Sequence, residues 1–252
     1  MINKRNEKIC ELLEEKKFLS IKELSKIFMV SENSIRRDLH ELDKNKRIII
    51  ISNGSITKNE LFQYKNEIDF LRKKSIAKKA ASFINNGDTI IIDGGTTTKL
   101  IIKFLKEIKK LTIFSPSIDI AYEVFLLNNP NITLISPGGI LDYKANQFFP
   151  YKFKEDIQDF NFDKGFLSAS GIDLINGVTN ENLISTPFKD MIIRSSKDFY
   201  FLIDSSKFAK SSLEKICNIK DIHNLITDAD IDEKVIQELQ KTIPNLIKVD
   251  LN

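Results

Sequence analysis

Short apolar segments alternate with helix-like segments between residues 89 and 249, and this alternation constrains the fold more than any other feature of the chain. Short continuous apolar strands separated by helices are typical of a parallel sheet covered on both faces. We therefore expect an α/β domain in this region. The expected strands are Thr89–Ile92, Leu111–Phe114, Ile132–Ile135, Lys164–Ala169, Phe199–Ile203, Leu225–Thr227 and Leu246–Val249, with helices at about 98–108, 118–127, 187–195 and 232–242.

A glycine turn follows the first of these strands and leads into a hydroxyl-rich helix start. Free backbone N–H groups and the helix dipole favour a phosphate at such a place, and ligands of parallel sheets bind beyond the carboxyl ends of the strands. The spacing matches neither GxGxxG nor GxxxxGK[ST], which disfavours a dinucleotide or a P-loop nucleotide. The alternative, a simple helix cap, does not require three consecutive threonines. The residues of this turn are Asp93, Gly94, Gly95, Thr96, Thr97 and Thr98.

Polar residues and glycines also lie at the ends of other expected strands. Serine hydroxyls can reach a sugar, glycines let the backbone approach a ligand, and Asp and Lys can bind a hydroxyl and a phosphate. Each also has a structural alternative, as a helix cap, a turn or a surface ion pair, so only their convergence on one crevice would favour binding. These candidates are Ser115, Gly138, Gly139, Gly171, Asp173, Asp204 and Lys207.

The first 57 residues predict a small helical domain. Ser20 opens a Ser-Ile-Lys-Glu capping box ahead of a second helix, and Ser31 can cap a third. On the third helix Ile35, Leu39 and Leu42 recur at the spacing of a buried face. The opposite face carries groups that bind base edges and phosphates, which is typical of the recognition helix of a helix-turn-helix; the alternative is a solvated charged face. The residues expected to face DNA are Ser31, Asn33, Ser34, Arg36, Arg37, His40 and Lys44.

Two β-rich stretches around Asn53-Gly54 follow the third helix and predict a hairpin, which would form a wing beside the recognition helix.

Charge is distributed unevenly along the chain. Residues 1–58 carry 13 Lys and Arg against 9 Asp and Glu, a net charge of +4, whereas the whole chain carries +3, so the remainder carries −1. A basic small domain joined to a nearly neutral large one indicates an anionic partner for the small domain.

Both parts of the chain resemble the DeoR family of bacterial regulators. The first part does so through SIKELSKIFMVSENSIRRDLHELDKNKRIIIISNGSI, which includes the family's IRRDL element, and the second through GDTIIIDGGTTTKL, FDKGFLSASGID, GVTNE and FLIDSSKF. We expect a winged helix-turn-helix domain (1–57), a linker (58–74) and an effector-binding and oligomerisation domain (75–252). The resemblance implies that the last is a Rossmann-like parallel-sheet domain related in fold to ribose 5-phosphate isomerase, with a phosphorylated sugar as effector.

The chain departs from the family pattern in two places. The family usually has an Arg two residues before a His-Gly-Gly wing tip, where this chain has Ile50 and then Ser-Asn-Gly (52–54), so the resemblance does not extend to wing contacts with DNA. Lys189 matches a family lysine on the helix after GVT. The acidic run that precedes this lysine in the family is here Leu-Ile-Ser (183–185), which implies a different or altered ligand.

These features predict a DNA-binding transcription regulator, a repressor of carbohydrate-metabolism genes controlled by a phosphorylated sugar or a related intermediate. Its partners are then double-stranded operator DNA, the effector and further copies of the chain in a homodimer or homotetramer, because such motifs usually read two half-sites. One alternative is a sugar-phosphate isomerase or deaminase, whose base would be Asp93, Asp173 or Asp204. A second alternative is a regulator that has lost its ligand.

Cysteine usage and hydropathy narrow the class further. Cys10 and Cys217 lie in unrelated segments without CxxC or His spacing, so we expect reduced thiols and neither a disulfide nor a metal or cofactor site. No apolar run reaches the length of a membrane span, and the charged start MINKRNEKICELLEEKK is unlike a signal peptide. We therefore expect a cytoplasmic protein without a membrane partner.

Overall fold

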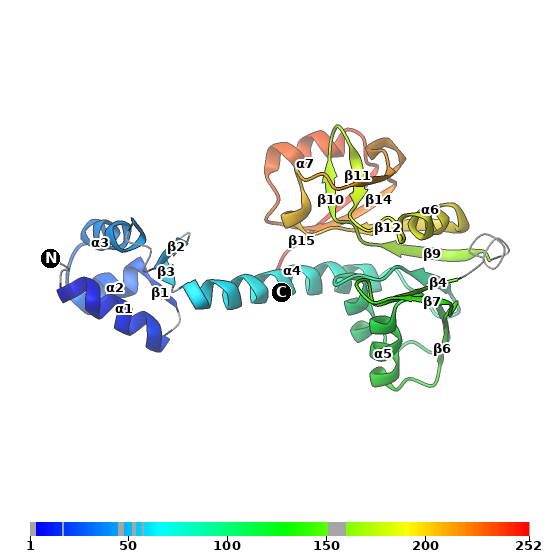
Figure 1. Ribbon diagram of the computed structural model, residues 1–252, viewed down its shortest axis with the longest axis horizontal. Coiled ribbons are helices and arrows are strands. Elements are labelled where there is room, and N and C mark those ends of the chain that lie inside the picture. The colour runs from blue at the N-terminus through cyan, green and yellow to red at the C-terminus, as the bar shows by residue number, and fades with distance from the viewer. Residues whose placement is uncertain are drawn as a thin grey trace. The chain divides into compact units, whose positions relative to one another are not determined.

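The computed structural model describes residues 4–16, 18–44, 48–51, 54–56, 58–150 and 160–251 (Figure 1). The chain divides into two compact units, Met1–Phe70 and Leu71–Asn252. The division falls within helix α4 (Lys58–Ala81). The segment expected as a linker is therefore helical throughout, and the helix continues beyond it to Ala81.

Before α4, the described residues of the first unit form three helices and a small antiparallel sheet of strand order β1-β3-β2. The expected capping box is present at the start of α2, because Glu23 N donates to Ser20 Oγ (3.1 Å) and Ser20 N donates to Glu23 Oε2 (2.8 Å). Strands β2 and β3 form the expected hairpin, of which Ser52 and Asn53 lie outside the described residues. Strand β1 was not expected from the sequence. The elements are α1 (Lys4–Lys16), β1 (Phe18–Ser20), α2 (Ile21–Phe28), α3 (Glu32–Lys44), β2 (Ile49–Ile51) and β3 (Gly54–Ile56).

The second unit is built on a seven-stranded sheet of order β15-β14-β12-β9-β4-β5-β6, in which all neighbouring strands are parallel. The seven strands and the four helical segments expected from the alternating pattern are all present, so the predicted α/β fold class is confirmed. The strands are β4 (Thr89–Ile92), β5 (Leu111–Phe114), β6 (Ile132–Ile135), β9 (Phe162–Leu167), β12 (Ser196–Leu202), β14 (Asn224–Asp228) and β15 (Asn245–Val249). The helices are the 3₁₀ helix η1 (Thr98–Phe104), α5 (Ile118–Leu127), α6 (Thr186–Ser195) and α7 (Glu233–Gln240).

Both faces of the large sheet are buried. Successive residues of β4 point to opposite faces, so Ile91 packs into one apolar cluster while Ile90 and Ile92 pack into the other. The cluster around Ile91 includes residues of α6 and α7, and the other includes residues of α4, η1 and α5. Helices thus cover the sheet on both sides, which leaves the ends of the strands as the places where polar side chains can gather.

Two smaller sheets extend this unit and were not expected from the sequence. The hairpin of β7 (Ile140–Asp142) and β8 (Gln147–Phe149) follows β6, and a sheet of order β10-β11-β13 begins directly after β9. Because β6 and β9 belong to the parallel sheet, both additions start at its carboxyl edge. Their remaining strands are β10 (Gly171–Asp173), β11 (Gly177–Asn180) and β13 (Glu214–Cys217), and two short 3₁₀ turns, η2 (Ser205–Lys207) and η3 (Ile219–Asp221), complete the unit.

Within the described ranges no helix is long and apolar enough to cross a membrane. The same ranges hold no group of three or more His, Cys, Asp and Glu side chains placed to bind a metal ion. Cys10 and Cys217 are free thiols. Burial raises the pKa of Cys217 to about 12, so this thiol stays protonated at neutral pH.

Candidate DNA-reading helix and effector pocket

Helix α3 presents one polar face to solvent. Ser31 lies just before the helix, and its hydroxyl accepts a hydrogen bond from Ser34 N (3.3 Å). Ile35, Leu39 and Leu42 are buried on the opposite face, as their spacing predicts. Of the residues expected to face DNA, Ser34 is half-buried and the others are exposed, namely Ser31, Asn33, Arg36, Arg37, His40 and Lys44.

An ion pair braces α3 against α1. The guanidinium of Arg5 donates to Asp38 through two bonds, from Nε to Oδ2 (2.6 Å) and from Nη2 to Oδ1 (2.9 Å). Asp38 is buried although it is charged, because it lies three residues after Ile35 on the apolar side of the helix. This role of Asp38 was not predicted from the sequence, where the signal for it is a charged residue within the apolar stripe. This ion pair fixes α3 against α1 and involves no residue of the exposed polar face.

A cavity of about 780 Å³ lies at the carboxyl edge of the large sheet, where the neighbouring strands β4 and β9 end. Strand β4 supplies the Asp-Gly-Gly turn at one wall, and the segment after β9 supplies another. The β7–β8 hairpin and the segment between β11 and α6 complete the rim. The polar lining consists of Gly94, Asp142, Lys144, Gln147, Ser168, Ser170, Asn180, Glu181, Asn182, Ser185 and Lys189.

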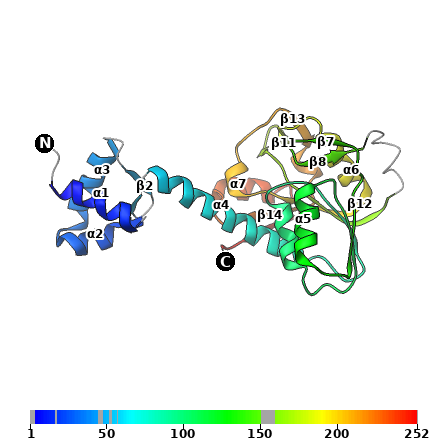
Figure 2. The ribbon, with the colours of Figure 1, turned by 60° about the horizontal axis from the view of Figure 1, so that its bottom comes forward.

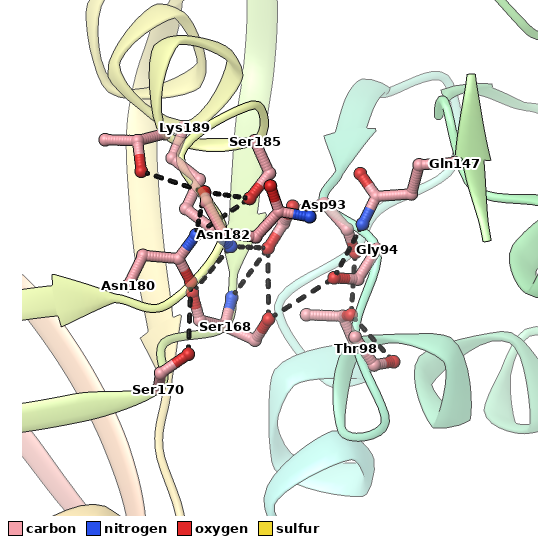
Figure 3. A network of polar contacts seen from close by, with 12 residues as sticks. Asp93, Gly94, Thr98, Gln147, Ser168, Ser170, Asn180, Asn182, Ser185 and Lys189 are labelled. Atoms are coloured by element: carbon pink, nitrogen blue, oxygen red, sulfur yellow. Dashed lines mark hydrogen bonds and ion pairs between the residues drawn. The ribbon is translucent and has the colours of Figure 1, made fainter. Parts of the chain in front are cut away.

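A buried ion pair forms the floor of this cavity (Figure 3). Asp93 and Lys189 are both almost inaccessible to solvent, and Lys189 Nζ donates to Asp93 Oδ2 and to the carbonyl of Ser168 (2.9 Å). Ser168 donates to the same carboxylate oxygen from its backbone N (3.2 Å) and its Oγ (3.0 Å). The other carboxylate oxygen, Asp93 Oδ1, has no hydrogen-bond partner among the described residues. One carboxylate thus joins the ends of β4 and β9 to helix α6.

The glycines of the turn after β4 are required by close approach of polar side chains. A Cβ atom on Gly94 would overlap the side chain of Gln147, and one on Gly95 would overlap Ser168 Oγ. The hydroxyl of Thr98 donates to the carbonyls of Asp93 (2.7 Å) and Gly95 (3.2 Å), so it stabilises the turn itself. Thr97 is buried and Thr96 is exposed. Within the described part of the chain, the backbone N–H groups of residues 95–97 donate no hydrogen bond.

The segment that lacks the family's acidic run contributes amides instead. Asn180 Nδ2 donates to Ser185 Oγ (2.7 Å) and to the carbonyl of Asn182 (2.9 Å). Figure 2 shows the β7–β8 hairpin and α6 as parts of the second unit, and a hydrogen bond from Asn182 Nδ2 to Asp142 Oδ2 (2.9 Å) joins the hairpin to the segment before α6. That bond lowers the pKa of Asp142 more than the bonds from the backbone N–H groups of residues 144 and 145. This bond between Asn182 and Asp142, called the clasp below, connects two segments of the cavity rim.

Several residues expected at the effector site do not line the cavity. Asp173 accepts hydrogen bonds from Ile175 N (2.8 Å) and Asn176 N (2.6 Å), so its carboxylate closes the turn between β10 and β11. Asp204 is buried and accepts from Ser206 N (3.1 Å), and Lys207 is half-buried at the end of the same turn. The carboxylates of Asp173 and Asp204 therefore bind backbone N–H groups of their own turns and do not face the cavity.

The remaining expected residues also shape the backbone near the cavity rather than line it. Ser115 Oγ is buried and donates to the carbonyl of Ile92 (2.8 Å). Gly138 and Gly139 have φ angles of 63° and 108°, which L side chains rarely adopt, and they form the turn before β7. A Cβ atom on Gly171 would overlap the carbonyl of Lys210. Of the residues expected from the motifs, Gly94 and Lys189 line the cavity, and Asp93 lies directly beneath it.

A helix-turn-helix unit joined to a parallel-sheet unit is the architecture of a DNA-binding transcription regulator with a sensor domain. Family models agree with this class: the DeoR-like helix-turn-helix domain matches residues 5–60, and the DeoR C terminal sensor domain matches residues 68–229. The chain belongs to the DeoR family of transcription regulators. The predicted family and the choice of a regulator over an enzyme are confirmed by these matches.

Curated relatives carry regulator names. The chain is 32% identical to the HTH-type transcriptional regulator YulB of Bacillus subtilis, over 95% of this chain and 94% of that protein. It is 34% identical to the HTH-type transcriptional regulator IolR of the same species, over 87% and 88% of the two chains. It is 26% identical to a putative aga operon transcriptional repressor of Escherichia coli O157:H7, over 98% and 94%.

Among solved structures, ribose 5-phosphate isomerase A from Methanocaldococcus jannaschii matches with a TM-score of 0.40 and 18% identity, over 56% of this chain and 55% of that chain. The similarity is too distant to support an argument about activity or ligand.

Proposed function

We propose that this regulator represses carbohydrate-metabolism genes and that a phosphorylated sugar, bound in the cavity at the carboxyl edge of the sheet, lowers its affinity for operator DNA. The observation that carries the proposal is the cavity itself, with a glycine turn at one wall, a buried ion pair at its floor and amides around its rim. The name of one relative, a putative aga operon transcriptional repressor, supports repression.

The cavity offers groups that suit both parts of a sugar phosphate. The glycine turn continues from Gly94, which lines the cavity, and the backbone N–H groups of its residues 95–97 donate no hydrogen bond within the described residues, so they suit phosphate oxygens at the cavity's edge. Asn180, Asn182 and Ser170 on the opposite side suit hydroxyl groups, which both donate and accept. Lys144 is an exposed cation at the rim, on the turn between β7 and β8. We therefore place the phosphate at the glycine turn and the sugar across the cavity.

On the DNA side, we propose that α3 enters the major groove, with Arg37 and Asn33 at base edges and Ser31, Arg36 and Lys44 at phosphates. Residues 1–57 would act as the DNA-binding domain, 58–74 as the connection and 75–252 as the sensor and assembly domain. Two half-sites require two recognition helices, so we propose a homodimer or homotetramer that acts in the cytoplasm. Control then follows from linkage: the effector binds the low-affinity state better and shifts the population toward it.

The test has two steps. An operator is first selected from random duplexes by its binding to the purified protein. Mobility shifts on that operator are then titrated with fructose 1-phosphate, fructose 6-phosphate, glucose 6-phosphate, N-acetylgalactosamine 6-phosphate and inorganic phosphate. We expect at least one sugar phosphate to release the operator and inorganic phosphate to have little effect. Operator binding that stays the same across the sugar phosphates would contradict effector control.

Two variants separate the functions. Gly94→Ala places a methyl group where Gln147 lies, so it should bind the operator but no longer respond to the sugar. Arg37→Ala should lose operator affinity but keep the thermal stabilisation that the sugar produces. If Gly94→Ala responds as the wild type does, the effector binds elsewhere.

A further inference from the structure

Gln147 brings a buried hydrogen-bond acceptor without a partner to the wall of the cavity. It begins strand β8, is 4% exposed, and its Nε2 donates to the carbonyl of Gly94 at 3.3 Å. Its Oε1 is covered and has no hydrogen-bond partner among the described residues. Figure 3 shows this amide beside Gly94, with Asp93 on the other side of the turn. Asp93 Oδ1 is a second buried acceptor without a partner.

The orientation of this amide is fixed by chemistry. If the amide were rotated by half a turn, Oε1 would face the carbonyl oxygen of Gly94, and two acceptors would meet. The group without a partner is therefore an acceptor, and the ligand group that complements it must be a donor. A phosphate dianion has only acceptor oxygens, whereas a sugar hydroxyl has an O–H to donate.

We propose that Gln147 is a specificity-determining residue of the effector site, which accepts a hydrogen bond from a sugar hydroxyl and selects against sugar phosphates that lack it. This inference rests on the proposed function. The bond that holds the amide on Gly94 is long, so a small shift of the side chain can bring Oε1 to a ligand while Nε2 stays on the carbonyl. A sugar with the hydroxyl gives this acceptor a partner that it lacks in the free protein, whereas a deoxy analogue leaves it unpaired and gains no such bond, so the site favours the parent sugar.

The position of Gln147 is set by its backbone and not by its side chain. The hairpin is tied to the start of α5, because Ile118 N donates to the carbonyl of Asn146 (2.9 Å) and Phe148 N donates to the carbonyl of Pro116 (2.8 Å). Gln147 also pairs with Ser117 in an isolated antiparallel bridge. A change of the side chain to one of similar length should therefore leave the hairpin in place. Gln147→Met then removes the amide group without moving the backbone of the cavity wall.

The experiment first ranks the sugar phosphates named above by thermal stabilisation of the full chain. The affinity of the best of them, and of each of its monodeoxy analogues, is then measured by calorimetry. For the wild type, we expect removal of one particular hydroxyl to weaken binding roughly tenfold or more. Gln147→Met should bind the parent sugar roughly tenfold more weakly and should not distinguish it from that analogue, which is the behaviour of a coupled pair in a double-mutant cycle.

The matched control is Gln237→Met, the same change at an exposed residue of α7, which should keep the wild-type affinities and preference. If Gln147→Met keeps the full preference for the hydroxyl, the inference is wrong and the proposed function stands. If no sugar phosphate stabilises the wild type, the proposed function fails and this inference with it. Should Gln147→Met not fold, the deoxy series on the wild type decides, and equal affinities throughout would overturn the inference.

Discussion

The two units each contain an ion pair that links separate segments, but the two pairs differ in how completely they are satisfied. In the first unit, Arg5 meets both carboxylate oxygens of Asp38 and remains partly exposed. In the second, Asp93 and Lys189 are almost fully buried, and one carboxylate oxygen has no partner among the described residues. The first pair can be complete because it only braces a helix. The second leaves a buried acceptor without a partner among the described residues, directly beneath the cavity.

The largest effect should come from the buried pair. Lys189→Met leaves the carboxylate of Asp93 buried without its cation, so it should destabilise the second unit by about 3–5 kcal/mol. Calorimetric unfolding of the full chain measures this as a lower midpoint for that unit. Lys197→Met is the matched control, because Lys197 pairs with Asp163 at the surface, and it should change the midpoint little. Equal effects of the two variants would remove the distinction between the sites.

The next effect concerns the exposed face of α3. Arg37→Ala removes an exposed cation that pairs with no carboxylate among the described residues, so it should weaken operator binding by about 1–3 kcal/mol with little change in stability. Fluorescence anisotropy with a labelled operator at two salt concentrations measures both the affinity and its salt dependence. Lys22→Ala, at an exposed residue of α2, is the comparison. A similar loss in both variants would indicate general charge attraction and not a recognition helix.

Breaking the brace behind α3 should have a smaller effect on stability. Asp38→Ala removes both bonds to Arg5, which can still be solvated, so we expect a loss of about 1–2 kcal/mol from the first unit. Asp43→Ala changes an exposed Asp of the same helix and should have almost no effect. Chemical denaturation followed by circular dichroism tests the pair. A stable Asp38→Ala protein with lost operator affinity would mean that the brace acts on DNA binding alone.

The smallest effect should be a pH dependence of the clasp at the cavity rim. The bond from Asn182 lowers the pKa of Asp142, so its contribution to stability is present above the unfolded pKa of about 3.9 and is lost as pH falls through the lower folded value. Asn182→Ala should raise the pKa of Asp142 toward its ordinary value, which carboxyl NMR titration measures. An unchanged titration would show that the clasp does not hold in solution.

The parallel sheet was predictable because each strand and each covering helix is coded locally, by a continuous apolar run or a helical repeat. The recognition face of α3 followed from the same periodicity. Only some of the residues that line the cavity could be predicted from such sequence patterns. Gly94 and Lys189 belong to recognisable motifs, whereas Asp204 and Lys207 follow β12, which is separated from β4 by β9. Neighbouring strands are about 4.8 Å apart, so the ends of strands that are not neighbours are separated by roughly twice that distance or more. Motifs at such strand ends therefore need not line the same crevice.

Gln147 and Asn182 could not be predicted because their place depends on tertiary contacts. Gln147 reaches Gly94 only through a hairpin that the sequence pattern did not indicate, and Asn182 reaches Asp142 across a gap of 40 residues in the chain. Neither contact leaves a periodic or compositional signal. The glycine at residue 94 was a partial signal, since it is needed for the approach of the Gln147 side chain and not for a left-handed backbone.

The central claim is that occupancy of the cavity and operator binding by α3 are coupled. The most direct test is to titrate the sugar phosphate that releases the operator into the free protein and into the protein–operator complex, with calorimetry as the readout. Coupling between two binding sites is reciprocal, so the sugar must bind the complex more weakly by the same factor by which it weakens operator binding. The account predicts this equality, with a factor on the order of 5–150. Equal affinity of the sugar for the free protein and the complex would contradict it.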